Sequence, residues 1–202
     1  MASITVPLEF ELTPRSRAVM NALSIALDPK FVDLEDRPTA AAADTITPSL
    51  SAPVAPGAWW PEQDGWYAGL QMTPGGRFWH LIVPKAHIDA LADVQWGGYG
   101  TQIEGAADVY DGLANTQAMS AAGLELAQRV QALGEGLYLP SRAEALLMFA
   151  TLKDQIGEGY VWTSTQYSAS YAWYQTFGDG LQDLNNKNTE RRAVAVRSIQ
   201  IV

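Results

Sequence analysis

Few residues of this 202-residue chain are suited to acid–base, nucleophilic or metal-dependent chemistry. The chain has no cysteine, which excludes disulfides, thiolate metal ligands and cysteine nucleophiles. His80 and His87 are its only histidines, and Asp89 is the nearest candidate for the third ligand that a metal site would need. Three such residues often occur together without a metal, so we interpret the histidines as surface or hydrogen-bonded structural residues. No metal site is predicted.

Nucleophiles and paired carboxylates give no stronger indication of catalysis. Serines are frequent, but the G-x-S-x-G motif of serine hydrolases is absent. Asp179 and Asp183 lie in a polar run at residues 178–190, where solvated turn residues are the simpler interpretation than an acid–base pair. Oxygen ligands for calcium are also available in this run, from Asn185, Asn186 and Asn188. We therefore expect a protein that is not an enzyme and that uses no cofactor.

The aromatic residues indicate both a core and a candidate recognition surface. Trp162, Trp173 and Phe177 are expected in the core, because buried aromatic rings dominate the packing of small domains. Exposed tyrosines beside small polar residues are typical of recognition surfaces, since tyrosine gives a large contact area at low entropic cost. The alternative is that these are ordinary surface tyrosines. Alternation in the strand predicted at 170–177 puts Trp173 on one face and Tyr174 and Thr176 on the other. The candidate ligand-binding residues are Tyr167 and Tyr171, which flank a Ser-Ala-Ser turn, Tyr174 and Thr176 on that second face, and Trp96, Tyr99 and Tyr110 in or beside a long loop.

Charge and composition exclude several classes of partner. The 22 acidic and 13 basic residues give a net charge of −9, which repels nucleic acid and anionic lipid. No stretch approaches the roughly 18 uninterrupted apolar residues of a membrane span, and residues 1–12 lack a signal-peptide pattern. We expect a chain made in a cytoplasm, which could still act outside the cell as part of a particle released by lysis.

Hydrophobic periodicity divides the chain into two parts. Residues 1–56 are predicted to form an attachment segment and linker, with an alternating strand at 4–12, a short apolar helix at 19–27 and an extended Pro/Ala-rich arm at 37–57. Residues 57–202 form an aromatic-rich α+β domain. Its predicted strands are 65–72, 77–84, 160–165, 170–177 and 192–202. Its predicted helices are 121–133 and one that opens at Ser141 with a Ser-x-x-Glu capping box. Residues 97–115, rich in Gly, Asp and Asn, are predicted to be a long irregular loop.

Four ordered motifs in this second part carry a family resemblance. They are LPSRAE at 139–144, YVWTST at 160–165, AWYQTFGDG at 172–180 and RAVAVR at 192–197. This set resembles the Lcl C-terminal domain family, also catalogued as DUF1566. Upstream segments are similar to its bacteriophage and prophage members: GWYAGL at 65–70, FWHLI at 78–82 and DGLANT at 111–116.

The resemblance implies a C-type-lectin-like fold, with two helices and a twisted antiparallel sheet, as found in bacterial adhesins and phage virion proteins. Neither the cysteines of the related formylglycine-generating oxidases nor the EPN or QPD tripeptide of calcium-dependent lectins is present. We therefore expect a non-enzymatic virion protein, attached to other virion proteins through residues 1–56, that binds a host-surface glycan or outer-membrane component. A homo-oligomer, with a trimer as one option, would add avidity.

Two alternatives remain open. The chain could be a structural capsid-decoration or baseplate component that makes only protein contacts, with the strand at 4–12 added to a partner's sheet. It could also be a bacterial cell-surface adhesin.

Overall fold

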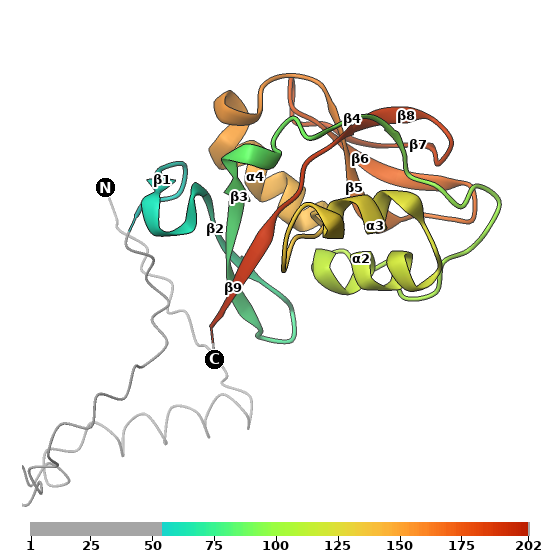
Figure 1. The fold of residues 1–202 in the computed structure, drawn as a ribbon, viewed down its shortest axis with the longest axis horizontal. Coiled ribbons are helices and arrows are strands. Elements are labelled where there is room, and N and C mark those ends of the chain that lie inside the picture. Colours follow the sequence, from blue (N-terminus) through green and yellow to red (C-terminus); the bar gives the residue numbers. More distant parts are fainter. Residues whose placement is uncertain (1–53, 202) are drawn as a thin grey trace, which may run out of the picture. The chain divides into compact units, whose positions relative to one another are not determined.

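The computed structural model describes residues 54–201, which contain three α-helices and two β-sheets (Figure 1). The strand predicted at 4–12, the helix predicted at 19–27 and the arm up to residue 53 lie outside the described residues. The predicted α+β class is confirmed, although the described residues contain three helices where the sequence predicts two.

The first sheet is built on a hairpin that the sequence predicts. β2 (Gly65–Met72) pairs antiparallel with β3 (Phe78–Pro84). The turn between them closes when Thr73 N–H donates to Arg77 O over 3.0 Å, and Gly76 takes a φ of +80°, which glycine tolerates without strain. β1 (Trp59–Trp60) and β9 (Arg197–Ile201) complete the antiparallel order β1-β2-β3-β9.

The second sheet contains five strands in the order β4-β8-β5-β6-β7. They are β4 (Leu91–Gln95), β8 (Glu190–Ala193), β5 (Tyr160–Gln166), β6 (Tyr171–Thr176) and β7 (Gln182–Asn186). β5 and β8 pair in parallel, whereas the other neighbours pair antiparallel. The strands predicted at 160–165 and 170–177 are confirmed as β5 and β6.

Two predictions near the C-terminal end of the chain are wrong. The polar run at 178–190 contains β7 rather than only loop, because an edge strand can pair along one side while its polar side chains stay partly exposed. The strand predicted at 192–202 is two strands in different sheets. Residues 194–196, which are fully buried, carry the chain from β8 to β9.

The helices follow the predicted pattern with one addition. α4 (Arg142–Ile156) begins at the predicted capping box, in which Ser141 Oγ accepts from Glu144 N–H and the Glu144 side chain accepts from Ser141 N–H. α3 (Glu125–Ala132) lies within the range predicted at 121–133. α2 (Gly112–Ala121) replaces the end of the predicted loop at 97–115, and Asp111 caps its N-terminus.

The hydrophobic core has two main parts. In one part, α2 packs against β5 and α3 against β4 of the second sheet, around Trp162 and Val130. In the other part, α4 packs against β2 of the first sheet and against β5 and β6 of the second, around Met148 and Phe177. Trp162 and Phe177 are fully buried, as predicted, whereas Trp173 is partly exposed.

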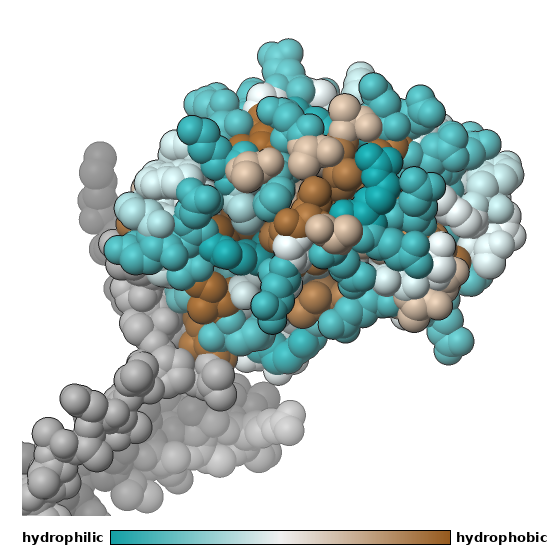
Figure 2. All heavy atoms as spheres, in the orientation of Figure 1, coloured by the Kyte–Doolittle hydropathy of each residue, from teal (hydrophilic) through white to brown (hydrophobic). Residues whose placement is uncertain are grey.

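Hydrophilic side chains cover most of the face seen in Figure 2 and separate its hydrophobic residues into small patches. Within residues 54–201, no helix combines the length and apolar character needed to cross a bilayer.

Candidate functional site

Residues 96–111 connect β4 to α2 without regular structure (green in Figure 1). The buried side chain of Gln166, at the end of β5, holds the middle of this loop. Its Oε1 accepts from Ile103 N–H over 2.9 Å and its Nε2 donates to Ile103 O over 2.7 Å. Its backbone N–H donates to Ala106 O over 2.7 Å. The loop is therefore fixed to the sheet as an adjacent strand would be.

A buried lysine fixes the start of the same loop. Lys187 has no exposed surface, and its Nζ donates to Thr101 O over 2.9 Å and to Gln166 Oε1 over 2.8 Å. The ammonium also lies 4.5 Å from the centroid of the Trp96 ring. Burial lowers the pKa of Lys187 to about 8. One side chain thus joins the loop, β5 and the segment after β7.

A second polar cluster fixes the end of the loop. Asn115 Oδ1 accepts from Asp108 N–H over 2.9 Å, and its Nδ2 donates to Asp108 O over 2.7 Å. Thr165 Oγ1 donates to the same carbonyl over 3.0 Å and accepts from Arg142 N–H over 3.1 Å. The loop, β5 and the start of α4 therefore form one hydrogen-bonded frame.

Four predicted site residues are exposed on this frame, and we call them the tyrosine surface: Tyr99, Tyr110, Tyr167 and Tyr171. Tyr167 is the most exposed at 60%, and Tyr99 is 55% exposed. Gly100 N–H donates to Ala169 O over 3.0 Å, which brings Tyr99 beside the turn that Tyr167 and Tyr171 flank.

Tyr110 belongs to the part of the frame next to α4. Its neighbour Val109 accepts a hydrogen bond from Ala143 N–H over 2.9 Å. The structure therefore places Tyr110 at the N-terminal end of that helix.

Three other predicted site residues do not belong to the tyrosine surface. Trp96 is fully buried, and its Nε1 donates to Thr163 O over 2.9 Å. Tyr174 is only 8% exposed and packs edge-on against Trp162 and Tyr160. Thr176 is partly exposed, but it lies at the end of β6 away from the turn. The strand alternation was correct, but Tyr174 is covered because β6 packs on both of its faces.

Sequence reasoning missed Arg142 and assigned Trp173 to the core. The Arg142 guanidinium lies 3.5 Å from the centroid of the Trp173 ring, and Tyr167 meets that ring edge-on at 5.8 Å. Arg142 Nε donates to Gln182 Oε1 over 3.2 Å, and Gln182 Nε2 donates back to Arg142 O over 2.8 Å. No local signal connects these residues, because they come from α4, β6, β7 and the β5–β6 turn.

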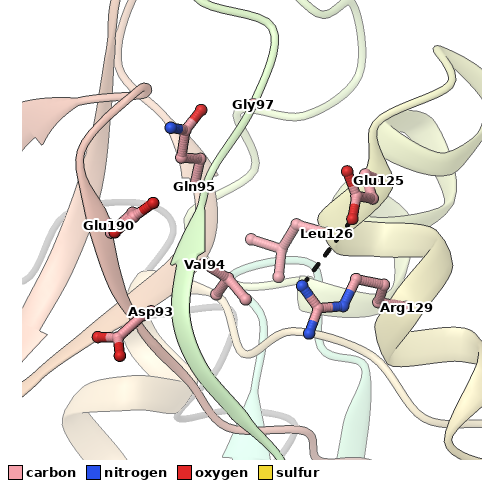
Figure 3. A pocket seen from close by; sticks show the side chains of 8 residues that line it. All are labelled: Asp93, Val94, Gln95, Gly97, Glu125, Leu126, Arg129 and Glu190. Carbon is pink, nitrogen blue, oxygen red and sulfur yellow. Dashed lines mark ion pairs between the residues drawn. The ribbon is translucent and has the colours of Figure 1, made fainter.

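A pocket of about 240 Å³ lies outside the tyrosine surface (Figure 3). Residues of β4 and β8 line one side of it, and Glu125 and Arg129 of α3 line the other, where they form an ion pair at 3.9 Å. Asp93 and Glu190 add two further carboxylates. The residues that line it include no serine, histidine or lysine.

Neither histidine lies in a cluster of metal-binding side chains within the described residues. His80 is buried in β3, is hydrogen-bonded to Tyr67 Oη through Nδ1 at 2.8 Å, and meets the Trp60 ring edge-on. His87 follows β3 in a short 3₁₀ turn, Lys85–His87. Within the part of the chain that the structure describes, no three His, Asp or Glu side chains gather closely enough to hold a metal ion.

Comparison of the sequence with models of known protein families and with curated proteins finds no match.

Proposed function

We propose that residues 57–202 form a non-enzymatic recognition domain of a bacteriophage particle, and that the tyrosine surface binds a structure on the host cell. The observation that carries this proposal is that Tyr99 and Tyr110 lie on a loop whose backbone is fixed by the buried side chains of Gln166, Lys187 and Asn115. A backbone hydrogen bond joins this loop to the β5–β6 turn that Tyr167 and Tyr171 flank. A fixed backbone reduces the entropy lost on binding, and exposed tyrosine provides contact area with few rotatable bonds.

The family resemblance supports a C-type-lectin-like fold for this domain. Its motifs contribute the α4 capping box, most of β5, β6 and the crossing from β8 to β9. The four residues of the tyrosine surface lie outside these motifs. Tyr167 and Tyr171 fall between the second and third motifs, and Tyr99 and Tyr110 fall before the first. We propose that the motifs build the framework of the domain and that the tyrosines between them add contact area for recognition.

The particle context follows from the phage-like segments and the two-part composition of the sequence. Residues 1–56 would attach the chain to other virion proteins, and the recognition domain would be displayed outward on the virion. Assembly as a homo-oligomer, such as a trimer, would convert weak single sites into strong attachment.

A binding experiment with the full chain tests the proposal. Fluorescently labelled protein is incubated with a panel of bacterial strains and with polysaccharides extracted from them. A double variant, Tyr99→Ala with Tyr167→Ala, should weaken saturable binding by about tenfold or more, as expected for central aromatic contacts. Tyr160→Ala is the matched control, because Tyr160 is similarly exposed but lies at the opposite end of the β5–β6 hairpin. Equal binding by the double variant, or no binding to any strain, would contradict the proposal.

The structural alternative has one specific observation in its favour. Leu70 and Met72 are exposed at the end of β2, in the first sheet rather than on the tyrosine surface, and Met72 is 56% exposed. Contact with another virion protein would cover them. Substitution of both residues by serine should impair incorporation into particles under this alternative, while the tyrosine variants assemble normally and retain infectivity.

A further inference from the structure

We infer that Arg142 is the anion-binding residue of the tyrosine surface, and that the ligand is a saccharide carrying a carboxylate or phosphate group. This inference rests on the proposed function and specifies the class of ligand.

The Arg142 guanidinium is held in place before any ligand arrives. Its carbon lies 3.5 Å from the centroid of the Trp173 ring, so one face of the guanidinium is stacked on the indole. The hydrogen bond from Nε to Gln182 Oε1 fixes its rotation about that contact. An arginine held in this way loses little side-chain entropy when it binds, which increases affinity.

The remaining donors of this guanidinium are free for a ligand. Within residues 54–201, neither terminal nitrogen of Arg142 has a hydrogen-bond acceptor, and neither is among the buried polar atoms without a partner. Both can therefore be reached from solvent. Two terminal N–H groups in one plane match the spacing of two oxygens on a carboxylate or phosphate.

No carboxylate of the described residues neutralises Arg142. The ion pairs among these residues join Arg77 with Asp111, Arg129 with Glu125 and Arg192 with Asp89. Burial lowers the pKa of Arg142, the direction expected for a partly buried guanidinium without an acidic neighbour.

The two acidic side chains that lie near Arg142 in the adjoining segments, Asp108 and Asp183, do not pair with its guanidinium. Asp108 Oδ1 accepts from the backbone N–H groups of Tyr110 and Asp111 within its own turn. Asp183 follows Gln182 in β7 and so projects from the opposite face of that strand. Neither carboxylate forms an ion pair with the guanidinium.

The surroundings of Arg142 favour a saccharide over a simple ion. Tyr167 packs edge-on against Trp173, the ring on which Arg142 is stacked, and its own side chain is 60% exposed. The exposed ring of Tyr167 can pack against the C–H groups of a sugar, and the free N–H groups of Arg142 can bind its acidic substituent.

The test uses polysaccharide extracted from a strain that the full chain binds. The polysaccharide is offered in its native form, after chemical reduction of its carboxylates to alcohols, and after removal of its phosphates with hydrofluoric acid. We expect one of the two treatments to weaken binding by about tenfold or more, and the sensitive treatment identifies the anion.

Variants of the protein complete the test. Arg142→Gln should reduce binding of native polysaccharide to the level seen with the charge-depleted form, and Arg142→Lys should restore part of the loss because it keeps the charge without the planar pair of donors. Arg129→Gln, at an exposed arginine of α3, should bind as the wild type.

Three results would overturn the inference: neither chemical treatment weakens binding, Arg142→Gln binds normally, or the bound material is destroyed by protease but not by periodate. If any of these occurs while Tyr99→Ala with Tyr167→Ala still loses cell binding, the proposed function stands without this ligand class. If no strain or extract binds, both fail.

Discussion

Nζ of Lys187 lies 2.8 Å from Oε1 of Gln166, and both side chains are buried. The same amide oxygen accepts from Ile103 N–H, so one acceptor serves the lysine and the loop together. This shared hydrogen bond connects the segment after β7 to the loop that carries Tyr99. The order of the tyrosine surface therefore depends on a buried cation that does not itself touch the surface.

The first prediction follows from this connection. Lys187→Met keeps the length of the side chain but removes the donor to Thr101 O, so residues 97–103 should open more often. Hydrogen exchange of these amides should accelerate by about tenfold, which corresponds to roughly 1.4 kcal/mol of local stability. The control is Lys153→Met, which removes an exposed lysine whose Nζ donates to Gly178 O. Exchange at 97–103 that is unchanged by Lys187→Met would contradict the role given to this lysine.

A second prediction concerns the pH dependence of stability. Burial sets the pKa of Lys187 in the folded state at about 8, whereas lysine in an unfolded chain titrates near pH 10.4. Between these values the unfolded state binds more protons, so the free energy of unfolding rises with pH. The wild type should therefore gain stability relative to Lys187→Met from about pH 8 to pH 10. Parallel denaturant unfolding curves of the two proteins over this range would argue against it.

Local patterns in the sequence predict the elements whose buried side is apolar. The β2–β3 hairpin and α4 are of this kind, since the Pro-Gly-Gly turn at 74–76 and the capping box act within a few residues. α2 was missed because its buried side includes Asn115 and Thr116, which give no apolar stripe. The edge strand β7 was missed for a similar reason, because its polar residues read as loop.

The candidate site depends on contacts between distant segments, so only its exposed tyrosines could be predicted. Trp173 and Arg142 lie 31 positions apart in the sequence and meet because α4 packs across β6. Tyr174 was assigned to an exposed face because alternation gives two faces to a strand but does not say whether both are covered. The Arg191 guanidinium of β8, 4.0 Å from the centroid of the Tyr174 ring, and the ring of Tyr160 in β5 cover this face.

Buried Glu144 provides a third prediction. Its carboxylate accepts from Trp79 Nε1 and Tyr138 Oη on one oxygen, and from the N–H groups of Gly112 and Ser141 on the other. Burial raises its pKa to about 7, above the value near 4.3 of an unfolded chain. Between these values the folded state binds more protons, so this group lowers the free energy of unfolding as pH rises from about 4.5 to 7.

Glu144→Gln should remove that pH dependence. The stability advantage of the wild type over the variant is then largest near pH 4.5 and decreases towards pH 7, as measured by denaturant unfolding at half-unit steps. The variant should also be destabilised at every pH by roughly 1–3 kcal/mol, because an amide N–H₂ must face donors that require an acceptor. A constant difference between the two proteins from pH 5 to pH 7 would refute the assignment of this titration to Glu144.

Gly112 gives a fourth prediction that needs no titration. A Cβ at this position would meet Glu144 Oε2, Leu139 O and Ser141 N closer than van der Waals contact allows, and two of these atoms belong to the backbone. Gly112→Ala should therefore cost roughly 2 kcal/mol or more, since a packed interior cannot absorb the added methyl group. Gly75→Ala, in the β2–β3 turn, meets only Thr73 Oγ1 at 3.8 Å and should be nearly neutral. Thermal unfolding of both variants decides the matter, and equal midpoints would be inconsistent with the packing described.

The last prediction separates the stacking of Arg142 from its charge. Trp173→Leu keeps an apolar side chain in β6 but removes the ring on which the guanidinium rests. Because this stack exists before a ligand binds, its loss acts through the entropy of ordering Arg142, about 0.5–1.5 kcal/mol. Binding of an acidic saccharide should therefore fall by roughly 2- to 13-fold, chiefly through faster dissociation. Trp59→Leu is the matched control, because Trp59 is also partly exposed and packs edge-on against one aromatic ring, that of Trp66 in the first sheet. Surface plasmon resonance of the two variants on immobilised polysaccharide measures both rates. If Trp173→Leu binds as tightly as the wild type while Arg142→Gln does not, the charge alone attracts the ligand and the indole does not position it.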